Sequence, residues 1–210
     1  MLLRKLEQML HELYALEVGY AVSDFLITDP ELARCLDAGG RKVDEKLLIA
    51  EADGEADVAL YLERELLDRL DRHDPLTKLD RDNLADFWSA LEGVSHFTYY
   101  AWNAARDKAV SLFELELQAE VDKFVTTGLL LREQTGREPG GLHGWLFDST
   151  TFAAELKEHE RERYHRANRY AAKYCQRLTL ARDDEAAAHR ELRHFYRLSQ
   201  TSKLAHIDAA

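Results

Sequence analysis

The sequence predicts an α+β protein that is predominantly helical, with an antiparallel core of four to five helices and a small β-hairpin near residues 46–62. Apolar residues recur at helical spacing over most of the 210-residue chain, and no proline occurs from 76 to 138. An Asp-Gly dipeptide at 53–54 separates two apolar segments, which is typical of a hairpin turn. Hydrophobic residues make up 46% of the chain, enough for a buried core.

A single domain over residues 1–210 is expected, with a mixed α/β N-terminal part and a helical part that begins at 76. Leucines at every third or fourth position predict the first helix over 2–18. The apolar, β-prone segment 20–28 predicts a short strand. Asp29-Pro30 then supplies the N-cap and first-turn residues of another short helix.

The predicted hairpin has a defined register. A two-residue type I′ turn at 53–54 places Ile49 opposite Val58. Leucines after the second segment continue at helical spacing, so we expect this strand to pass into a helix near Glu63.

The rest of the chain is expected to form long helices. Their predicted ranges are about 82–107, 110–133, 150–180 and 183–202. Between the second and third of these, Thr135–Asp148 is rich in glycine and also contains His143, Trp145 and Phe147. We expect a connecting loop here, which either closes over a site or is fixed to the body by its two aromatic side chains.

The net charge and the lack of targeting segments limit the classes of partner and location that we expect. The net charge is −11, so nucleic acid is an unlikely partner, although residues 161–210 carry a local charge of +5. We expect this basic segment to pack on the acidic body. The two cysteines form no metal-binding motif, and neither a signal-peptide core nor a membrane-spanning run is present. A cytoplasmic protein without membrane contact is therefore expected.

The residues most suited to chemistry form two polar stripes at i, i+4, i+7 and i+11. The stripe on the 82–107 helix consists of Glu92, His96, Tyr99 and Asn103. The stripe on the 110–133 helix consists of Glu116, Glu120, Lys123 and Thr127. A short link makes these helices antiparallel neighbours, so the stripes are able to face one another.

Facing stripes would form a metal site. Its predicted ligands are Glu92, His96, Glu116 and Glu120. Three carboxylates and an imidazole suit Mn²⁺, Fe²⁺ or Zn²⁺, whereas carboxylates alone suit Mg²⁺. Tyr99, Lys123 and His143 are expected to support the ligands or to contact substrate.

The same residues also fit a purely structural seam. Glu120 and Lys123 have the spacing of an ordinary helix ion pair. A di-iron bundle is disfavoured: Glu191–His194 has the Glu-x-x-His spacing that it needs, but His194 falls opposite the apolar face of its helix, and the pairs Glu155/His159 and Glu185/His189 are spaced by four.

Two function classes remain. The sequence contains no Walker, Gly-x-Ser-x-Gly or His-Glu-x-x-His motif, which favours a non-catalytic protein that binds a protein partner or forms a homo-oligomer. The alternative is a metal-dependent hydrolase of a phosphorylated or small polar substrate, in which the metal activates a bound water.

Overall fold

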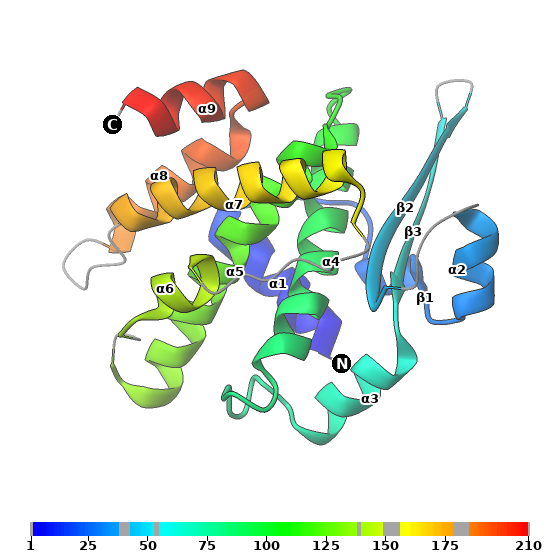
Figure 1. Cartoon of the computed structure of the whole chain (residues 1–210), viewed down its shortest axis with the longest axis horizontal. Helices are drawn as coiled ribbons and strands as arrows, with labels where there is room; N and C mark the ends of the chain where they lie inside the picture. The colour runs from blue at the N-terminus through cyan, green and yellow to red at the C-terminus, as the bar shows by residue number, and fades with distance from the viewer. Residues whose placement is uncertain are drawn as a thin grey trace.

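The computed structural model of the chain describes residues 2–37, 43–52, 55–137, 140–148, 156–178 and 185–209. Of the described residues, 68% are helical, and a small mixed sheet lies beside the helices, which confirms the predicted fold class (Figure 1). The helices are α1 (Leu2–Tyr14), α2 (Pro30–Leu36), α3 (Arg64–Arg72), α4 (Leu84–Ala104), α5 (Leu112–Thr135), α6 (Leu142–Phe147), α7 (Glu158–Arg177), α8 (Glu185–Arg197) and α9 (Gln200–Ala209).

Helices α4 and α5 lie at the centre of the molecule. Helix α4 packs against α1, α3, α5 and the sheet, while α5 packs against α6 and α7. A capping box starts α5: the Glu114 N–H donates to Ser111 Oγ, and the Ser111 N–H donates to Glu114 Oε2. Gly136, in the left-handed conformation, ends this helix. The buried apolar cluster extends along the chain from Leu2 to Ile207.

The sheet consists of β1 (Leu26–Ile27), β2 (Glu45–Ala52) and β3 (Glu55–Leu62), in the order β1-β3-β2. Strands β2 and β3 are antiparallel, and Ile49 lies opposite Val58 as predicted. Helix α3 begins directly after Glu63, again as predicted. The turn at 53–54 lies outside the described residues. One face of β2 and β3 packs on α4.

Two predictions about the C-terminal half are wrong. The helix expected over 183–202 is divided into α8 and α9, because the Ser199 side chain accepts the Ser202 N–H and starts a new helix. The loop expected over 135–148 contains α6, which buries Leu142 and Leu146. Of its two aromatic side chains, Phe147 is buried against Phe124, with ring centroids 5.9 Å apart, and fixes the segment to the body as predicted, whereas Trp145 is 47% exposed.

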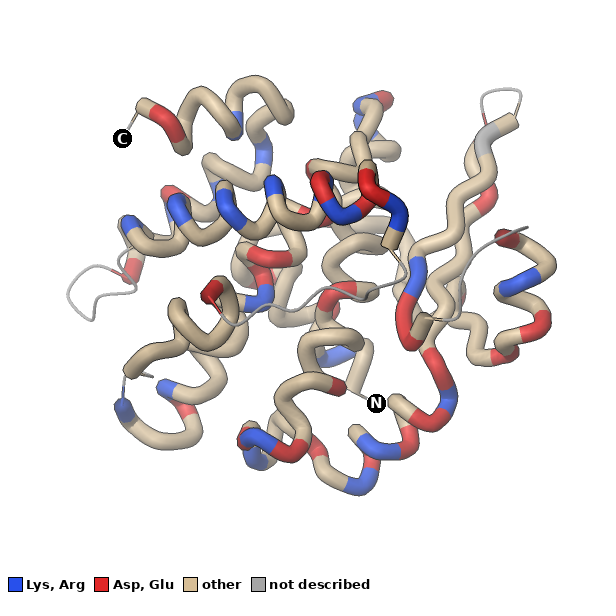
Figure 2. Tube along the Cα trace, viewed as in Figure 1, with Lys and Arg blue, Asp and Glu red and all other residues tan. Residues whose placement is uncertain are grey.

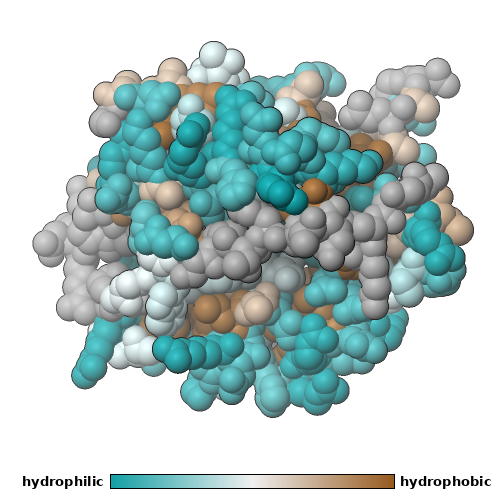
Figure 3. Space-filling view, viewed as in Figure 1, coloured by the Kyte–Doolittle hydropathy of each residue, from teal (hydrophilic) through white to brown (hydrophobic). Residues whose placement is uncertain are grey.

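Charges are distributed unevenly over the helices. In Figure 2, basic positions follow one another along α7, whereas acidic positions occur on α4, α5 and the start of β2. The face in Figure 3 is mostly hydrophilic, with small apolar areas between polar side chains. Among the described residues, no helix combines the length and the apolar character that crossing a membrane requires.

Candidate metal centre

Side chains from β2, α4 and α5 converge on His96, which is 7% exposed. Its Nδ1 lies 3.4 Å from Glu45 Oε1, and its Nε2 lies 3.7 Å from Glu116 Oε2. One ligand atom each from Glu45, Glu92 and His96 lies within 4.8 Å of the other two. The centre therefore offers two carboxylates and an imidazole at one place, with a third carboxylate next to the imidazole.

The β-hairpin register directs Glu45 into this centre. Glu45 is paired with Leu62, so the two side chains share a face of the sheet. That face lies against α4 at Gly93, where an added Cβ would be only 2.9 Å from Glu45 Cγ and from Leu60 Cδ1. The missing side chain at Gly93 thus allows the sheet to approach α4, and Glu45 reaches the residues on either side of this glycine.

Two cations border the carboxylates. Lys123 Nζ lies 2.5 Å from Glu92 Oε2 and 3.0 Å from Glu120 Oε1. This ammonium group therefore links Glu92 of α4 to Glu120 of α5, the helix that carries Lys123. From α7, Arg163 Nε lies 3.4 Å from Glu116 Oε1. Arg163 Nε and His96 Nε2 are both buried without a hydrogen-bond partner in the described structure, and both lie next to Glu116.

The pKa values of the centre reflect an excess of negative charge. Burial alone would lower the pKa of His96, but the carboxylates of Glu45, Glu116 and Glu92 outweigh it and raise this pKa to about 9. Burial raises the pKa of Glu116 to about 7 and also raises that of Glu45. Burial would raise the pKa of Glu92 too, but Lys123 and His96 hold it below the usual value.

The charge count explains these shifts. Four carboxylates meet two permanent cations and one imidazole. Without a further cation, protons on His96 and Glu116 compensate for the excess. A divalent ion would compensate for it directly, and carboxylate oxygen with imidazole nitrogen is a donor set that Mn²⁺, Fe²⁺ and Zn²⁺ accept. The unpartnered His96 Nε2 further fits a ligand role.

The structure brings together most of the residues predicted from the stripes. Glu92, His96, Glu116, Glu120 and Lys123 all belong to the same cluster. Of the four predicted ligands, however, only Glu92 and His96 belong to the group whose ligand atoms lie within 4.8 Å of one another. Glu45 and Arg163 also belong to this cluster, but neither was predicted from the sequence. Strand alternation was a usable signal for Glu45, since it shares its face with Leu47 and the inner leucines of β3, whereas no sequence signal places Arg163 here.

Tyr99 and His143 lie elsewhere. The Tyr99 ring packs against Tyr196, with a centroid separation of 5.0 Å, and Lys203 Nζ lies 4.6 Å from the Tyr99 centroid. His143 lies on α6, where its Nε2 is 2.9 Å from the carbonyl oxygen of Ala172. Neither side chain contacts the Glu45–Glu92–His96 group in any described interaction, so the structure does not support their predicted role at the centre.

A second buried polar cluster lies on the other side of α5. Asp122 is fully buried and accepts hydrogen bonds from Tyr14, from Ser95 at 2.5 Å and from Gln118 at 2.9 Å. Lys203 of α9, also fully buried, donates to Gln118 Oε1 at 2.6 Å. Because these hydrogen bonds satisfy the cluster, its role is to join α1, α4, α5 and α9.

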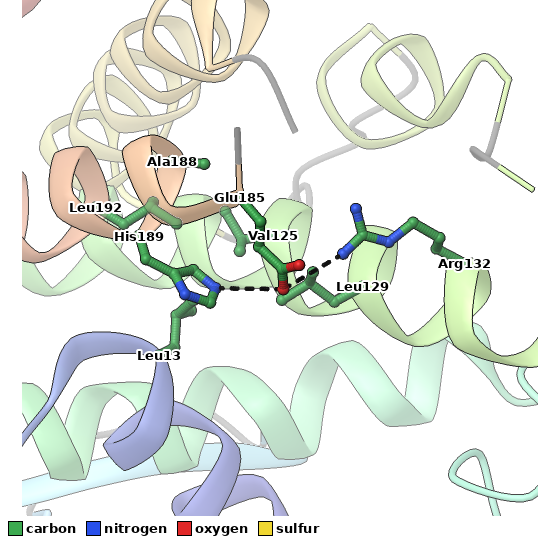
Figure 4. A pocket seen from close by; sticks show the side chains of 8 residues that line it. All are labelled: Leu13, Val125, Leu129, Arg132, Glu185, Ala188, His189 and Leu192. Atoms are coloured by element: carbon green, nitrogen blue, oxygen red, sulfur yellow. Dashed lines mark ion pairs between the residues drawn. The ribbon is translucent and has the colours of Figure 1, made fainter. Parts of the chain in front are cut away.

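Figure 4 shows a third group of charged side chains, where α8 approaches α5. Glu185 Oε1 lies 4.0 Å from His189 Nε2 and 3.9 Å from Arg132 Nη2. The cavity beside them has a volume of about 10 Å³, and leucines, valine and alanine complete its lining. This space suits at most one water molecule, so the group is not a ligand site.

Comparison of the chain with protein-family models, with curated proteins and with solved structures found no match. The function must therefore be inferred from the geometry of the centre itself.

Proposed function

We propose that this chain is a metal-dependent hydrolase whose single divalent ion is bound by Glu45, Glu92 and His96. The observation that carries the proposal is the convergence of their ligand atoms within 4.8 Å in a partly buried place with an excess of carboxylates. Metal–ligand bonds of about 2.0–2.2 Å need only small side-chain movements from this spacing.

The remaining residues have distinct roles in this proposal. A divalent ion held by these ligands would supply a nucleophile, because it would lower the pKa of a coordinated water. Glu116 lies beside the imidazole but outside the group of three ligands, which suits a base that accepts the proton of this water. Lys123 keeps Glu92 ionised, and Arg163 lies where an anionic substrate group would need a cation. A phosphorylated or small polar substrate fits this charge arrangement.

Metal binding is the first test. After removal of ions with a chelator, calorimetric titration with Mn²⁺ and Zn²⁺ should show one ion per chain. Glu45→Gln and Glu92→Gln, which keep side-chain volume, should weaken binding by about 10–100-fold or more. Asp122→Asn is the matched control, because this carboxylate is buried in the second cluster and should leave metal affinity unchanged.

Hydrolysis is the second test. The metal-loaded chain should cleave p-nitrophenyl phosphate or p-nitrophenyl acetate, and both ligand variants should lose this activity. A chain that binds no metal, or that binds it equally well in all variants, would refute the metal centre. Metal binding without hydrolysis of either ester would restrict the proposal to a metal-binding role.

A protein-binding or homo-oligomeric role is the second candidate. Helix α2 has no buried residue, and its Leu32 and Leu36 are 44% and 56% exposed. These leucines lie one turn apart and present apolar surface to the same side. Absence of bound metal would make this surface the leading functional feature.

A further inference from the structure

A cavity of about 430 Å³ lies between the α4–α5 connection and the junction of α8 with α9. Both segments are at the top of the view in Figure 1, and Ser111 Oγ donates to Gln200 Oε1 at 2.5 Å between them. Asn103, which lines the cavity, is seven residues beyond His96 on α4, or about 10 Å along the helix axis. The cavity is therefore separate from the candidate metal centre.

The cavity contains a buried carboxylate with an unused oxygen. Glu114 is 7% exposed, and its Oε2 accepts a hydrogen bond from the N–H of Ser111 and lies 3.1 Å from Ser111 Oγ. No described residue donates a hydrogen bond to Glu114 Oε1, and no described cation lies within ion-pair distance of Glu114, although the buried Lys203 amine interacts with this carboxylate electrostatically. A buried carboxylate in this state is a binding point for a positively charged donor.

Cations without carboxylate partners line the same cavity. Lys108 is exposed, and its Nζ lies 5.5 Å from the centroid of Trp102. Arg197 donates only to carbonyl oxygens, those of Arg193, Tyr14 and Ala15. Neither side chain forms an ion pair with any residue that the structure describes. The positive charge at this side of the cavity is thus available to an anionic group.

The first turn of α9 adds hydrogen-bond donors on this side. Ser199 accepts the N–H groups of Ser202 and Lys203, through Oγ and the carbonyl oxygen respectively. The N–H groups of Gln200 and Thr201, which precede them, have no acceptor within the helix. Both residues line the cavity, and the positive end of the helix dipole favours an anion there.

We propose that this cavity binds a small zwitterion of the α-amino-acid class. The ammonium group would contact Glu114 Oε1, and the carboxylate would contact Lys108, Arg197 and the start of α9. A simple anion would be repelled by Glu114, and a simple cation by Lys108 and Arg197. A zwitterion satisfies both signs of charge, and Ala109 and Leu198 offer apolar contacts for its side chain.

The test is a binding screen of the full chain with each common L-amino acid, by calorimetry and thermal shift. At least one should bind, whereas its N-acetyl and its carboxamide derivatives should bind at least tenfold more weakly. Glu114→Gln should weaken binding at least tenfold while it keeps the capping box, since glutamine also serves at this position. Lys108→Gln should have a similar effect.

Two exposed residues provide matched controls. Glu133→Gln on α5 and Lys5→Gln on α1 make the same charge changes away from the cavity and should leave binding unchanged. The proposal is overturned if no amino acid binds, if the capped derivatives bind as tightly, or if the two cavity variants bind like the controls. None of these measurements depends on a bound metal or on hydrolysis, so the result is independent of the proposed hydrolase activity.

Discussion

Gly93 is the residue that allows the sheet and the helices to share one polar centre. A glycine inside a helix normally costs about 1 kcal/mol relative to alanine. Here its missing Cβ leaves room for Glu45 Cγ, Leu60 Cδ1 and Leu62 Cδ2, which would lie 2.9–3.2 Å from that atom. The cost to the helix is thus offset by close contact with the hairpin.

We expect Gly93→Ala to move Glu45 away from Glu92 and His96. The gain in helix propensity should be outweighed by overpacking of about 1–3 kcal/mol. The larger effect should be on Mn²⁺ affinity, which we expect to fall at least tenfold because one ligand is displaced. Denaturant unfolding and calorimetric titration measure the two effects.

In Gly19→Ala, where nothing lies within 4 Å of the added atom, metal affinity should be unchanged. Wild-type affinity in the Gly93 variant would contradict this placement of Glu45.

Residue spacing predicted part of the centre and failed for the rest, for a physical reason. Glu92 and His96 lie where β2 crosses α4, whereas Tyr99 lies one turn further along the same side of the helix. At this position along α4, Tyr99 contacts Tyr196 and Lys203 instead of the sheet. Helical spacing predicts which side chains point in the same direction, but it does not predict which element packs against them. That element depends on tertiary packing, which also brings in Arg163.

At the scale of elements, the sequence predicted the hairpin better than the C-terminal helices. The register of β2 with β3 matches the one predicted from the Asp-Gly dipeptide and the alternating side chains, which are local signals. The division between α8 and α9 follows from Ser199, whose side chain caps the second helix. A serine within a long helical pattern is compatible either with an N-cap or with a position inside a continuous helix. Apolar periodicity alone therefore did not predict the end of α8 and the start of α9.

Lys203 attaches α9 to the body through a buried amine. Its Nζ donates to Gln118 and lies 4.6 Å from the ring centroids of both Tyr99 and Phe195. Burial lowers its pKa to about 7, although Asp122 and Glu114 oppose this shift. Between pH 7 and the usual value of 10.5, the folded chain therefore holds fewer protons at this site than the unfolded chain. This difference makes the folded state more stable as the pH rises.

We predict that the stability difference between wild type and Lys203→Met changes with pH. The wild type should gain free energy of unfolding relative to the variant from pH 7 to 9.5, at most about 1.4 kcal/mol per pH unit. Other groups, including His96 with its raised pKa, are common to both proteins and cancel in the comparison. Urea unfolding at several pH values measures the difference.

Lys173→Met removes the exposed lysine that pairs with Asp208 of α9 and should show no such trend. A pH-independent difference for Lys203→Met would contradict the buried neutral amine.

At the scale of the whole molecule, the candidate centre joins the N-terminal and helical parts of the chain. Glu45 belongs to the sheet, Glu92 and His96 to α4, and Glu116 to α5. The apolar cluster likewise includes residues of β3, of α1 and of α9. Because an ion bound here would contact both parts, its binding energy should add to the stability of the complete fold instead of to one segment.

This coupling predicts a single unfolding transition that moves as a whole when metal is added. For one site, a hundredfold excess of Mn²⁺ over its dissociation constant contributes about 2.7 kcal/mol, or roughly 5–10 °C in midpoint for a chain of this length. Glu45→Gln should keep the single transition but lose the metal-dependent shift. Scanning calorimetry with and without Mn²⁺ distinguishes this outcome from its alternative. If sheet and helices unfolded in separate steps, with only the helical step responding to metal, Glu45 would not be a ligand and the chain would not form the single domain predicted here.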